Sequence, residues 1–230
     1  MNKIIILTGA GVSAESGLET FRSEDGLWAQ HRIEDVATPE GFMRDPDLVL
    51  RFYNRRRADC AAARPNAAHQ ALAALEQAPG HDVLLVTQNV DDLHERAGSQ
   101  NVIHMHGALN LAKCHDCGHG WPAPERMSVS DRCARCQARA TRPDIVWFGE
   151  MPSQMARIEA ALQQADLFVA IGTSGQVWPA AGFAQQARMC GAATLELNIE
   201  PTAVRGDFRD GRYGPAGEVV PAWVEEVLRR

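Results

Sequence analysis

The sequence predicts an α/β fold in which a Rossmann-like parallel sheet carries a smaller inserted domain. Short continuous apolar runs alternate with helix-favouring segments, a pattern typical of parallel strands that are buried on both faces. A glycine-rich segment directly follows the first apolar run, where such sheets have a tight strand-to-helix turn. Residues 31–80 and 107–142 interrupt the alternation, and we interpret both stretches as insertions into the sheet domain.

The expected strands are short apolar runs. A chain of 230 residues that is 45% hydrophobic is long enough for one sizeable core with a small satellite domain. Right-handed crossovers would connect the strands and place the intervening helices on the faces of the sheet. The runs are residues 3–8, 82–87, 101–104, 145–148, 166–171 and 194–198.

The segments between these runs favour helix. Gln154–Ala165 and Pro179–Cys190 are rich in alanine, and Val219–Leu228 has an amphipathic pattern. Residues 31–80 have the pattern of consecutive helices, with Asn66 placed to cap the N-terminus of the last one.

Composition and charge exclude several classes of protein. The 23 basic and 29 acidic side chains give a formal net charge of -6, which argues against non-specific nucleic-acid binding through phosphate contacts. The apolar runs fall far short of the roughly 20 residues that a membrane helix needs, and the run after Lys3 is too short for a secretion signal. We therefore expect a cytoplasmic protein with no membrane segment and no specific nucleic-acid partner.

A glycine-rich turn follows the first expected strand. Gly9–Ala14 matches the dinucleotide-binding pattern G-x-G-x-x-[GA]. Glycines at such a turn let backbone amides approach a pyrophosphate, and a following helix N-terminus offers unpaired N–H groups. Tight packing is the alternative role for these glycines. The acid that dehydrogenases place about 20 residues later has no strand to follow, because Ser16–Trp28 has the character of a loop.

Four of the six cysteines fall into two tight pairs. The pairs Cys114–Cys117 and Cys133–Cys136 have the spacing of a four-cysteine zinc site. Four thiolates leave no open coordination position, so the expected zinc ion is structural and not catalytic. His115 and His119 are alternative ligands. A nucleic-acid-binding ribbon is the rival interpretation, although Trp121 is the one aromatic side chain of residues 107–142 that could stack on bases.

These features define the expected domains. The small domain combines a helical insertion with the zinc module, and the Rossmann-like domain is assembled from three separate segments of the chain. We assign residues 1–30, 81–106 and 143–230 to the Rossmann-like domain, and residues 31–80 and 107–142 to the small domain.

Polar residues follow two of the expected strands at their carboxyl ends. Gln88, Asn89 and Asp91 follow one strand, and His106 follows the next. Open α/β sheets bind ligands at that edge. Amide and carboxylate groups suit ribose hydroxyls and a carboxamide, and histidine has an intrinsic pKa suited to general-base catalysis. A lone histidine is more often structural, and His104 on the same strand face could fill a polar gap.

Several short motifs, in a fixed order around the cysteines, resemble a sirtuin. The likeness spans nearly the whole chain and is to the bacterial sirtuins of class III, which are NAD-dependent protein lysine deacylases. The motifs are Gly9–Gly17, Thr20–Arg22, Gln88–Asp91, His104–Gly107, Phe148–Glu150, Gly172–Ser174 and Asn198–Glu200.

The resemblance implies NAD as co-substrate, bound between the two domains. By this similarity the stretch from Gly9 to Trp28 would bind the pyrophosphate and the nicotinamide ribose, and the residues from Gly172 onward would bind the adenosine half. The implied cofactor contacts are Gly9, Ala10, Gly11, Ser13, Ala14, Glu15, Thr20, Phe21, Arg22, Trp28, Gln88, Asn89, Val90, Asp91, Gly172, Thr173, Ser174, Asn198, Ile199, Glu200 and Ala216.

The resemblance also implies the reaction. The acyl oxygen of an acylated lysine would displace nicotinamide, and His106 would act as general base on the ribose hydroxyls. Asn89 and Asp91 would position the ribose and the carboxamide. The products would be lysine, nicotinamide and O-acyl-ADP-ribose. A protein mono-ADP-ribosyltransferase or a non-catalytic NAD-sensing regulator could use the same NAD site, although the three residues together argue against the regulator.

The expected partners are acylated lysine side chains of proteins, and we expect the chain to be a monomer. Residues 146–150 resemble the loop that pairs with the substrate peptide as an added strand. The implied substrate contacts are Ala37, Tyr53, Arg56, Val146, Phe148, Gly149 and Glu150.

Two of these residues predict the acyl preference. Tyr53 and Arg56 are three positions apart on an expected helix and so share a face. A phenol and a guanidinium on one face can form a carboxylate receptor. The class III sirtuins resemble this chain in that pair and in a small residue at the position of Ala37. The resemblance predicts succinyl-lysine and malonyl-lysine as substrates, with acetyl-lysine also accepted. Without it, Arg55–Arg57 would be interpreted as a solvated charged run.

Overall fold

The computed structural model describes residues 2–19 and 30–229 and is built on a six-stranded sheet with the order β3-β2-β1-β7-β8-β9. All neighbouring strands of this sheet run parallel. The fold class predicted from the sequence is therefore confirmed. The strands are β1 (Asn2–Thr8), β2 (His81–Thr87), β3 (Val102–His104), β7 (Leu167–Ile171), β8 (Ala193–Asn198) and β9 (Asp210–Tyr213).

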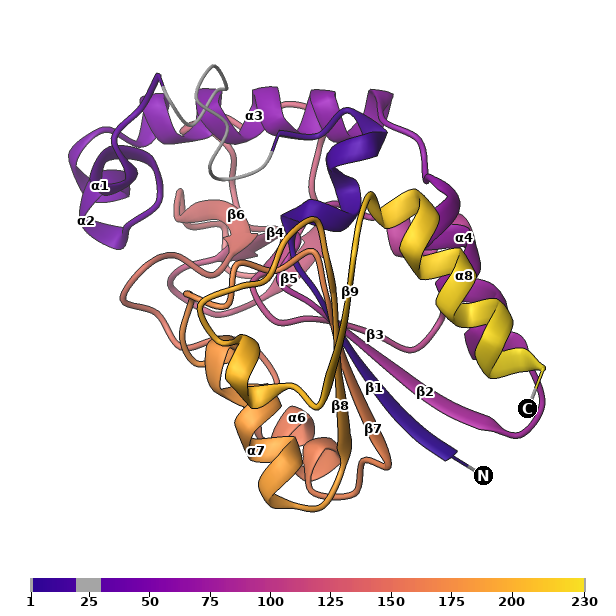
Figure 1. Cartoon of the computed structure of the whole chain (residues 1–230). Coiled ribbons are helices and arrows are strands. Elements are labelled where there is room, and N and C mark those ends of the chain that lie inside the picture. The colour runs from indigo at the N-terminus through magenta and orange to yellow at the C-terminus, as the bar shows by residue number, and fades with distance from the viewer. Residues whose placement is uncertain (1, 20–29, 230) are drawn as a thin grey trace.

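Helices cover both faces of this sheet. One face packs against α6 (Met155–Leu162) and α7 (Phe183–Met189). The opposite face packs against α4 (Ala67–Gln77) and α8 (Ala216–Leu228), and Figure 1 shows the two pairs on opposite sides. Since successive strand residues point to opposite faces, a strand between two helical layers must be apolar throughout. The run Ile4–Leu7 meets this requirement, because it contributes alternately to the two cores.

A second, antiparallel sheet forms the small domain with three helices. It has the order β5-β4-β6 and consists of β4 (Gly107–Cys114), β5 (Gly120–Pro122) and β6 (Thr141–Ile145). The long helix α3 packs on it through Phe52 and Tyr53, which join a buried cluster with Leu109 and Trp147. The three helices are α1 (Ile33–Val36), α2 (Pro39–Arg44) and α3 (Pro46–Ala62).

Short helical turns complete the chain. They are the 3-10 helices η1 (Ala10–Ser16), η2 (Ala180–Gly182) and η3 (Arg205–Asp207) and the short helix α5 (Leu93–Ala97). Within residues 2–19 and 30–229, no helix combines the length and the apolar character that crossing a bilayer requires.

The expected strand at residues 145–148 is wrong. Residues 141–145 instead form β6, which pairs antiparallel with β4 in the small sheet. Of the apolar side chains in this run, Ile145 and Trp147 are buried, in the cluster that α3 forms with the small sheet, whereas Phe148 is exposed. The edge strand β9 was not expected, because Asp210, Gly211 and Arg212 give it no apolar pattern.

The packing of α4 differs from the expected domain division. Asn66 caps this helix as predicted, since its Oδ1 accepts hydrogen bonds from the N–H groups of Ala68 and His69. The apolar face of α4, however, lies in the same cluster as α8 and the strands β1 and β2. We therefore propose that the helical part of the small domain ends near residue 66 and that α4 belongs to the sheet domain.

The cap residue Asn66 gives a first prediction. Its amide nitrogen also donates to the carbonyl of Val12 at 2.8 Å and to Ser16 Oγ at 3.0 Å, so one side chain connects α4 to η1. Asn66→Ala should lower the free energy of unfolding by about 1–2 kcal/mol in urea titrations. Asn66→Asp keeps the capping oxygen and loses the amide donor, so its loss should be smaller. Equal losses in the two variants would contradict the capping role.

Candidate active site

Two glycine turns meet at the carboxyl edge of the parallel sheet. β2, the next strand of this sheet along the chain, lies on one side of β1, and β7 lies on the other side. The β1/β7 junction is therefore a topological switch point, where open α/β sheets bind ligands. Gly11 N donates to Gly172 O at 2.8 Å. A Cβ added to Gly9 would lie 2.8 Å from Gly172 O, and one added to Gly11 would lie 2.8 Å from Gly172 Cα. These glycines therefore permit close backbone packing, and at least one amide of the turn is used within the chain.

The expected cofactor residues lie along this edge. Gly9–Glu15 follows β1, Gln88–Asp91 follows β2, Gly172–Ser174 follows β7, and Asn198–Glu200 begins at the last residue of β8. Ala216 is the first residue of α8, shortly after β9. The structure thus brings together segments that are far apart in the sequence. Four further expected contacts, Thr20, Phe21, Arg22 and Trp28, lie outside the described residues.

Ser13, Asn89 and Asp91 form a buried hydrogen-bonded cluster in this edge. Ser13 Oγ donates to Asp91 Oδ2 at 3.1 Å, and Asn89 Nδ2 lies 3.2 Å from both Ser13 Oγ and Gly9 O. Burial raises the pKa of Asp91, although hydrogen bonds from Leu93 N and Ser13 oppose the rise. The polar groups of these side chains are therefore held in fixed directions before any ligand arrives.

His69 completes this cluster and was not expected from the sequence. Its Nε2 lies 3.4 Å from Ser13 Oγ, and burial lowers its pKa to about 4, so it is neutral at neutral pH. A second buried histidine, His94, has its ring centre 4.8 Å away and contacts Thr8 Oγ1 at 3.0 Å. The only sequence signal for His69 is a polar residue on the buried face of the alanine-rich helix α4.

His106 lies two residues after the end of β3, and one of its ring nitrogens has a hydrogen-bond partner. Its Nδ1 is 3.1 Å from the carbonyl oxygen of Gln88. A carbonyl can only accept, so Nδ1 carries the proton and Nε2 has an available lone pair. Burial lowers the pKa of His106, with the Gln88 carbonyl opposing the change. The ring is therefore neutral at neutral pH, which is the state that a general base requires.

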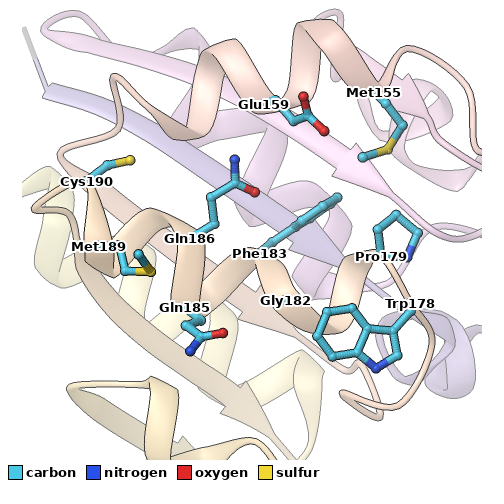
Figure 2. Close-up of a pocket in the computed structure, with 10 residues that line it drawn as sticks. All are labelled: Met155, Glu159, Trp178, Pro179, Gly182, Phe183, Gln185, Gln186, Met189 and Cys190. Atoms are coloured by element: carbon cyan, nitrogen blue, oxygen red, sulfur yellow. The ribbon is translucent and has the colours of Figure 1, made fainter.

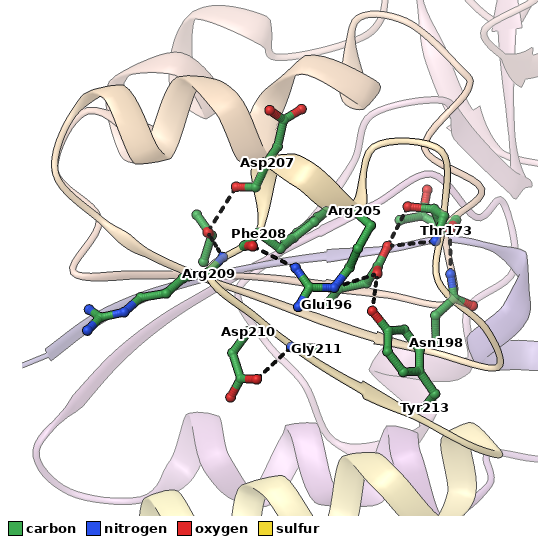
Figure 3. A network of polar contacts seen from close by, with 12 residues as sticks. Thr173, Glu196, Asn198, Arg205, Asp207, Phe208, Arg209, Asp210, Gly211 and Tyr213 are labelled. Atoms are coloured by element: carbon green, nitrogen blue, oxygen red, sulfur yellow. Dashed lines mark hydrogen bonds and ion pairs between the residues drawn. The ribbon is translucent and has the colours of Figure 1, made fainter.

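The buried carboxylate of Glu196 is the centre of a polar network near the β8 end of the sheet edge, as Figure 3 shows. Glu196 on β8 is 2% exposed and accepts hydrogen bonds from Tyr213 Oη at 2.9 Å and from the hydroxyl of Thr202. Two residues further, Asn198 Nδ2 donates to the carbonyl of Thr173 at 2.8 Å, and Thr173 Oγ1 donates to Gln88 Oε1 at 2.8 Å. The turns after β2, β7 and β8 are thereby connected.

Two acidic residues of the expected site, Glu15 and Glu150, have hydrogen-bond partners within the chain. Glu15 Oε1 accepts a hydrogen bond from Gly217 N at 2.9 Å, in the first turn of α8. Glu150 binds the buried Arg142 with N–O distances of 2.7 and 2.9 Å and also accepts from Trp147 N. These contacts fix the backbone of their segments, so each carboxylate has a structural partner whether or not a ligand is present.

The expected acyl-binding residues are close together in the small domain. Phe148 N donates to Ala37 O at 3.0 Å. Tyr53 is 1% exposed, and its oxygen accepts a hydrogen bond from Trp147 Nε1 at 3.0 Å, which leaves its own O–H proton for another acceptor. Burial raises the pKa of Tyr53, although the charge of Arg56 opposes the rise. The guanidinium carbon of Arg56 lies 5.8 Å from the Tyr53 ring centre.

The four paired cysteines form one cluster. Their sulfur atoms all lie within 4.8 Å of one another, with Cys114 and Cys136 at 3.6 Å and Cys117 and Cys133 at 3.7 Å. A tetrahedral zinc with Zn–S bonds of about 2.3 Å requires sulfur atoms about 3.8 Å apart. The cluster therefore fits zinc, with all four positions filled by thiolates. Of the side chains that the structure describes, neither His115 nor His119 belongs to it.

A groove on the outer surface lies apart from these residues. It has a volume of about 330 Å³ and lies between α6 and α7, where Trp178, Phe183 and Met155 line it. Figure 2 shows these side chains around the opening. None of the expected cofactor, substrate or metal residues lines it, so it is not the predicted site.

Fold and site together define a class of protein: a dinucleotide-binding α/β protein with its site at a switch point and a four-cysteine zinc module in an inserted domain. Comparison with known proteins identifies the family. Residues 9–179 match the Sir2 family. The chain belongs to the Sir2 family.

Relatives and solved structures agree with this assignment. The NAD-dependent protein deacylase of Vibrio cholerae is 58% identical over 228 residues, covering 98% of this chain and 93% of the relative. That of Caulobacter vibrioides is 56% identical over 232 residues, covering 99% and 98%. A Sir2 homologue solved with NAD is 40% identical with a TM-score of 0.91, covering 99% of this chain and 90% of that one.

The cysteine cluster gives a second prediction. Purified protein should contain one zinc ion per chain by metal analysis, and Cys117→Ser should lose it and unfold at a lower temperature, because a structural zinc site contributes directly to folding. Cys190→Ser is the matched control, since Cys190 is exposed and lies outside the cluster. Full zinc content in the Cys117 variant would contradict the assignment of this ligand.

Proposed function

We propose that this Sir2-family chain is an NAD-dependent protein lysine deacylase, which transfers the acyl group of an acylated lysine to ADP-ribose. The observation that supports this most is the position of His106. Asn89 and Asp91 follow β2, and His106 follows the neighbouring strand β3, with a neutral ring and an available Nε2 lone pair. A general base beside amide and carboxylate groups suits a reaction at ribose hydroxyls. Relatives above 55% identity are named NAD-dependent protein deacylases.

The site's own residues fit NAD. Bound NAD would offer an anomeric carbon that carries a cationic leaving group, so a positioned acyl oxygen could displace nicotinamide. The turn from Gly9 packs its backbone directly against Gly172, and glycines at such a turn would let backbone amides approach the pyrophosphate. Asn89 and Asp91 would orient the nicotinamide ribose and the carboxamide. His106 would take a proton at Nε2 from a ribose hydroxyl. With one water consumed, lysine, nicotinamide and O-acyl-ADP-ribose would leave.

The substrate peptide would lie along residues 146–150. The N–H groups of Val146, Trp147 and Phe148 are already bonded within the chain, to His106 O, Glu150 Oε2 and Ala37 O respectively. Glu150 N donates to the carbonyl oxygen of Trp147, so a peptide added as a strand would pair through the remaining carbonyl and N–H groups of this segment unless these bonds break. Such main-chain pairing tolerates varied flanking sequence. A Sir2 variant that is 27% identical, with a TM-score of 0.83 and coverage of 98% of this chain and 93% of that one, was solved with a deacetylated p53 peptide and 3'-O-acetyl-ADP-ribose.

Succinyl and malonyl groups are the acyl groups that we propose as preferred substrates, with acetyl also accepted. Tyr53 has a phenol proton available for donation, and Arg56 adds a cation next to its ring. A carboxylate that receives a phenol and a guanidinium gains charge-assisted hydrogen bonds. The small Ala37 lies in the same buried cluster as Tyr53, which is consistent with a site wide enough for a longer acyl chain. A monomeric state, a cytoplasmic location and the absence of a nucleic-acid partner also remain part of this proposal.

The direct test is a nicotinamide-release assay with succinyl, malonyl and acetyl peptides. We expect nicotinamide release that depends on both NAD and an acylated peptide, and O-acyl-ADP-ribose in the mass spectrum.

His106→Asn should lower kcat by roughly 10²–10⁴-fold without lowering the midpoint of thermal unfolding. Because burial lowers the pKa of His106, wild-type activity should persist below the ordinary histidine pKa and fall only as the base is protonated at still lower pH. ADP-ribose attached to the protein, with no acyl-ADP-ribose, would instead identify a transferase.

The acyl preference has its own test. Arg56→Met should reduce kcat/KM for a succinyl peptide by roughly 10- to 100-fold, the range expected when a charged hydrogen-bond partner is lost, and should leave deacetylation nearly unchanged. Arg55→Met is the matched control, because Arg55 is the next residue on α3 and pairs with Asp59 at 3.0 Å. Equal losses for succinyl and acetyl peptides would reject the carboxylate-receptor role of Arg56.

A further inference from the structure

His104 is the last residue of β3 and lies two residues before His106. Both of its ring nitrogens have partners. Nδ1 is 3.1 Å from the main-chain carbonyl oxygen of Asn89, and Nε2 is 2.6 Å from Glu95 Oε1 on α5. Its side chain is 17% exposed. One ring therefore joins the segment that carries Asn89 to the helix that follows it.

Neither partner of this ring can donate a hydrogen bond. A backbone carbonyl has no proton, and an ionised carboxylate only accepts. Burial on its own would raise the pKa of Glu95, but the hydrogen bond and the charge of His104 lower it below its ordinary value. Glu95 is therefore ionised at neutral pH. Two acceptors on opposite sides of one imidazole require both ring nitrogens to carry protons, which only the imidazolium form provides.

The surrounding charges agree with this assignment. Burial on its own would lower the pKa of His104, but Glu95, the Asn89 carbonyl and Asp91 together raise it above its ordinary value. Glu95 and His94 face it from α5, and Asp91 faces it from the preceding loop. His94 is neutral, because burial holds its pKa well below the ordinary value. The charged groups that face His104 are thus both acidic.

We propose that His104 is a positioning residue that acts as an imidazolium: it ties the main chain of Asn89 to Glu95 and so holds Asn89 and Asp91 in place for NAD. This inference rests on the deacylase function proposed above. His104 touches neither co-substrate in this account and acts through Asn89. Deprotonation would leave one ring nitrogen with a lone pair facing an acceptor, so one of the two contacts would be lost. The link from Asn89 through His104 to Glu95 is complete while His104 is protonated and is lost as the pH rises through the raised pKa of His104.

Two histidines on one segment would therefore work in opposite protonation states. His106 has one acceptor at Nδ1 and must be neutral to act as a base, whereas His104 has acceptors at both nitrogens and must be charged. Environments that separate the pKa values of neighbouring groups are a common way to assign them different roles. Turnover would decline at low pH when His106 is protonated, and at high pH when His104 loses its proton.

The first test is an NMR titration of protein labelled with 15N in its histidine rings. The two ring nitrogens of His104 should resonate close together at pH 7, as in an imidazolium, and separate only at higher pH. Glu95→Gln retains an oxygen acceptor and removes the charge, so the pKa of His104 should fall by roughly one unit or more. Nitrogens that are already far apart at pH 7 in the wild-type protein would overturn the proposal.

The second test links this titration to turnover. The alkaline limb of kcat for nicotinamide release should move to lower pH in Glu95→Gln by the same shift as the NMR pKa. The glutamine side chain in His104→Gln cannot be charged and can donate to only one partner. This variant should therefore lower kcat by a larger factor than it changes the KM for NAD, and its kcat should show no alkaline limb. Glu159→Gln on α6 is the matched control for the loss of one negative charge and should not move the limb.

The outcomes separate this inference from the proposed function. An alkaline limb that stays in place in Glu95→Gln, while the NMR pKa falls, would reject the role of His104 in turnover and leave the deacylase function intact. Absence of nicotinamide release from the wild-type protein at every pH would reject the function itself, and the kinetic inference with it. Unfolding curves of both variants identify any loss of kcat that comes from loss of the fold.

Discussion

The site depends on the close contact between two backbone turns at the β1/β7 junction. Gly11 N reaches Gly172 O at 2.8 Å, and no Cβ could be accommodated at Gly9 or Gly11 without displacing the backbone after β7. Gly172 has a φ of 58°, a conformation that favours glycine. This contact holds the start of η1 over the carboxyl edge of the sheet. Ser13 thereby reaches Asn89 and Asp91, and the segments after β1, β2 and β7 form one continuous edge.

Beneath that edge, burial controls protonation. His69 and His94 are neutral because burial opposes their positive charge, and the pKa of Asp91 is raised for the corresponding reason. His106 keeps one proton through its contact with the Gln88 carbonyl. The hydrogen bonds among Ser13, Asn89 and Asp91 hold these buried polar groups in place. The same hydrogen bonds that stabilise this layer therefore orient the groups that would meet NAD.

Much of the fold could be predicted because its signals are local. β1, β2 and β7 are continuous apolar runs, and burial between two helical layers explains that pattern. The zinc cysteines have a recognisable spacing within each pair. The strand β9 could not be predicted, since an edge strand needs no apolar pattern, and the run at 145–148 was assigned to the wrong sheet because burial against a helix produces the same composition as burial within a sheet.

The sequence predicts individual residues of the candidate site, but not most of the contacts between them. Their positions after strands predict Gln88, Asn89 and His106 as site residues, because the carboxyl ends of parallel strands meet at one edge. His69 lies 56 positions from Ser13, and no local pattern relates the two. The pairing of His104 with Glu95 likewise depends on how α5 packs beside β3. Contacts of this kind follow from tertiary packing, so they became visible only in the structure.

A crystal structure with an acylated peptide and a non-reactive NAD analogue is the most direct measurement of the central claim. We predict the pyrophosphate against the turns at Gly9 and Gly172, and the acyl oxygen facing the anomeric carbon of the nicotinamide ribose, with its hydroxyls within hydrogen-bonding reach of His106 Nε2. The two ligands bound too far apart to react, or the dinucleotide bound away from the β1/β7 junction, would contradict the account.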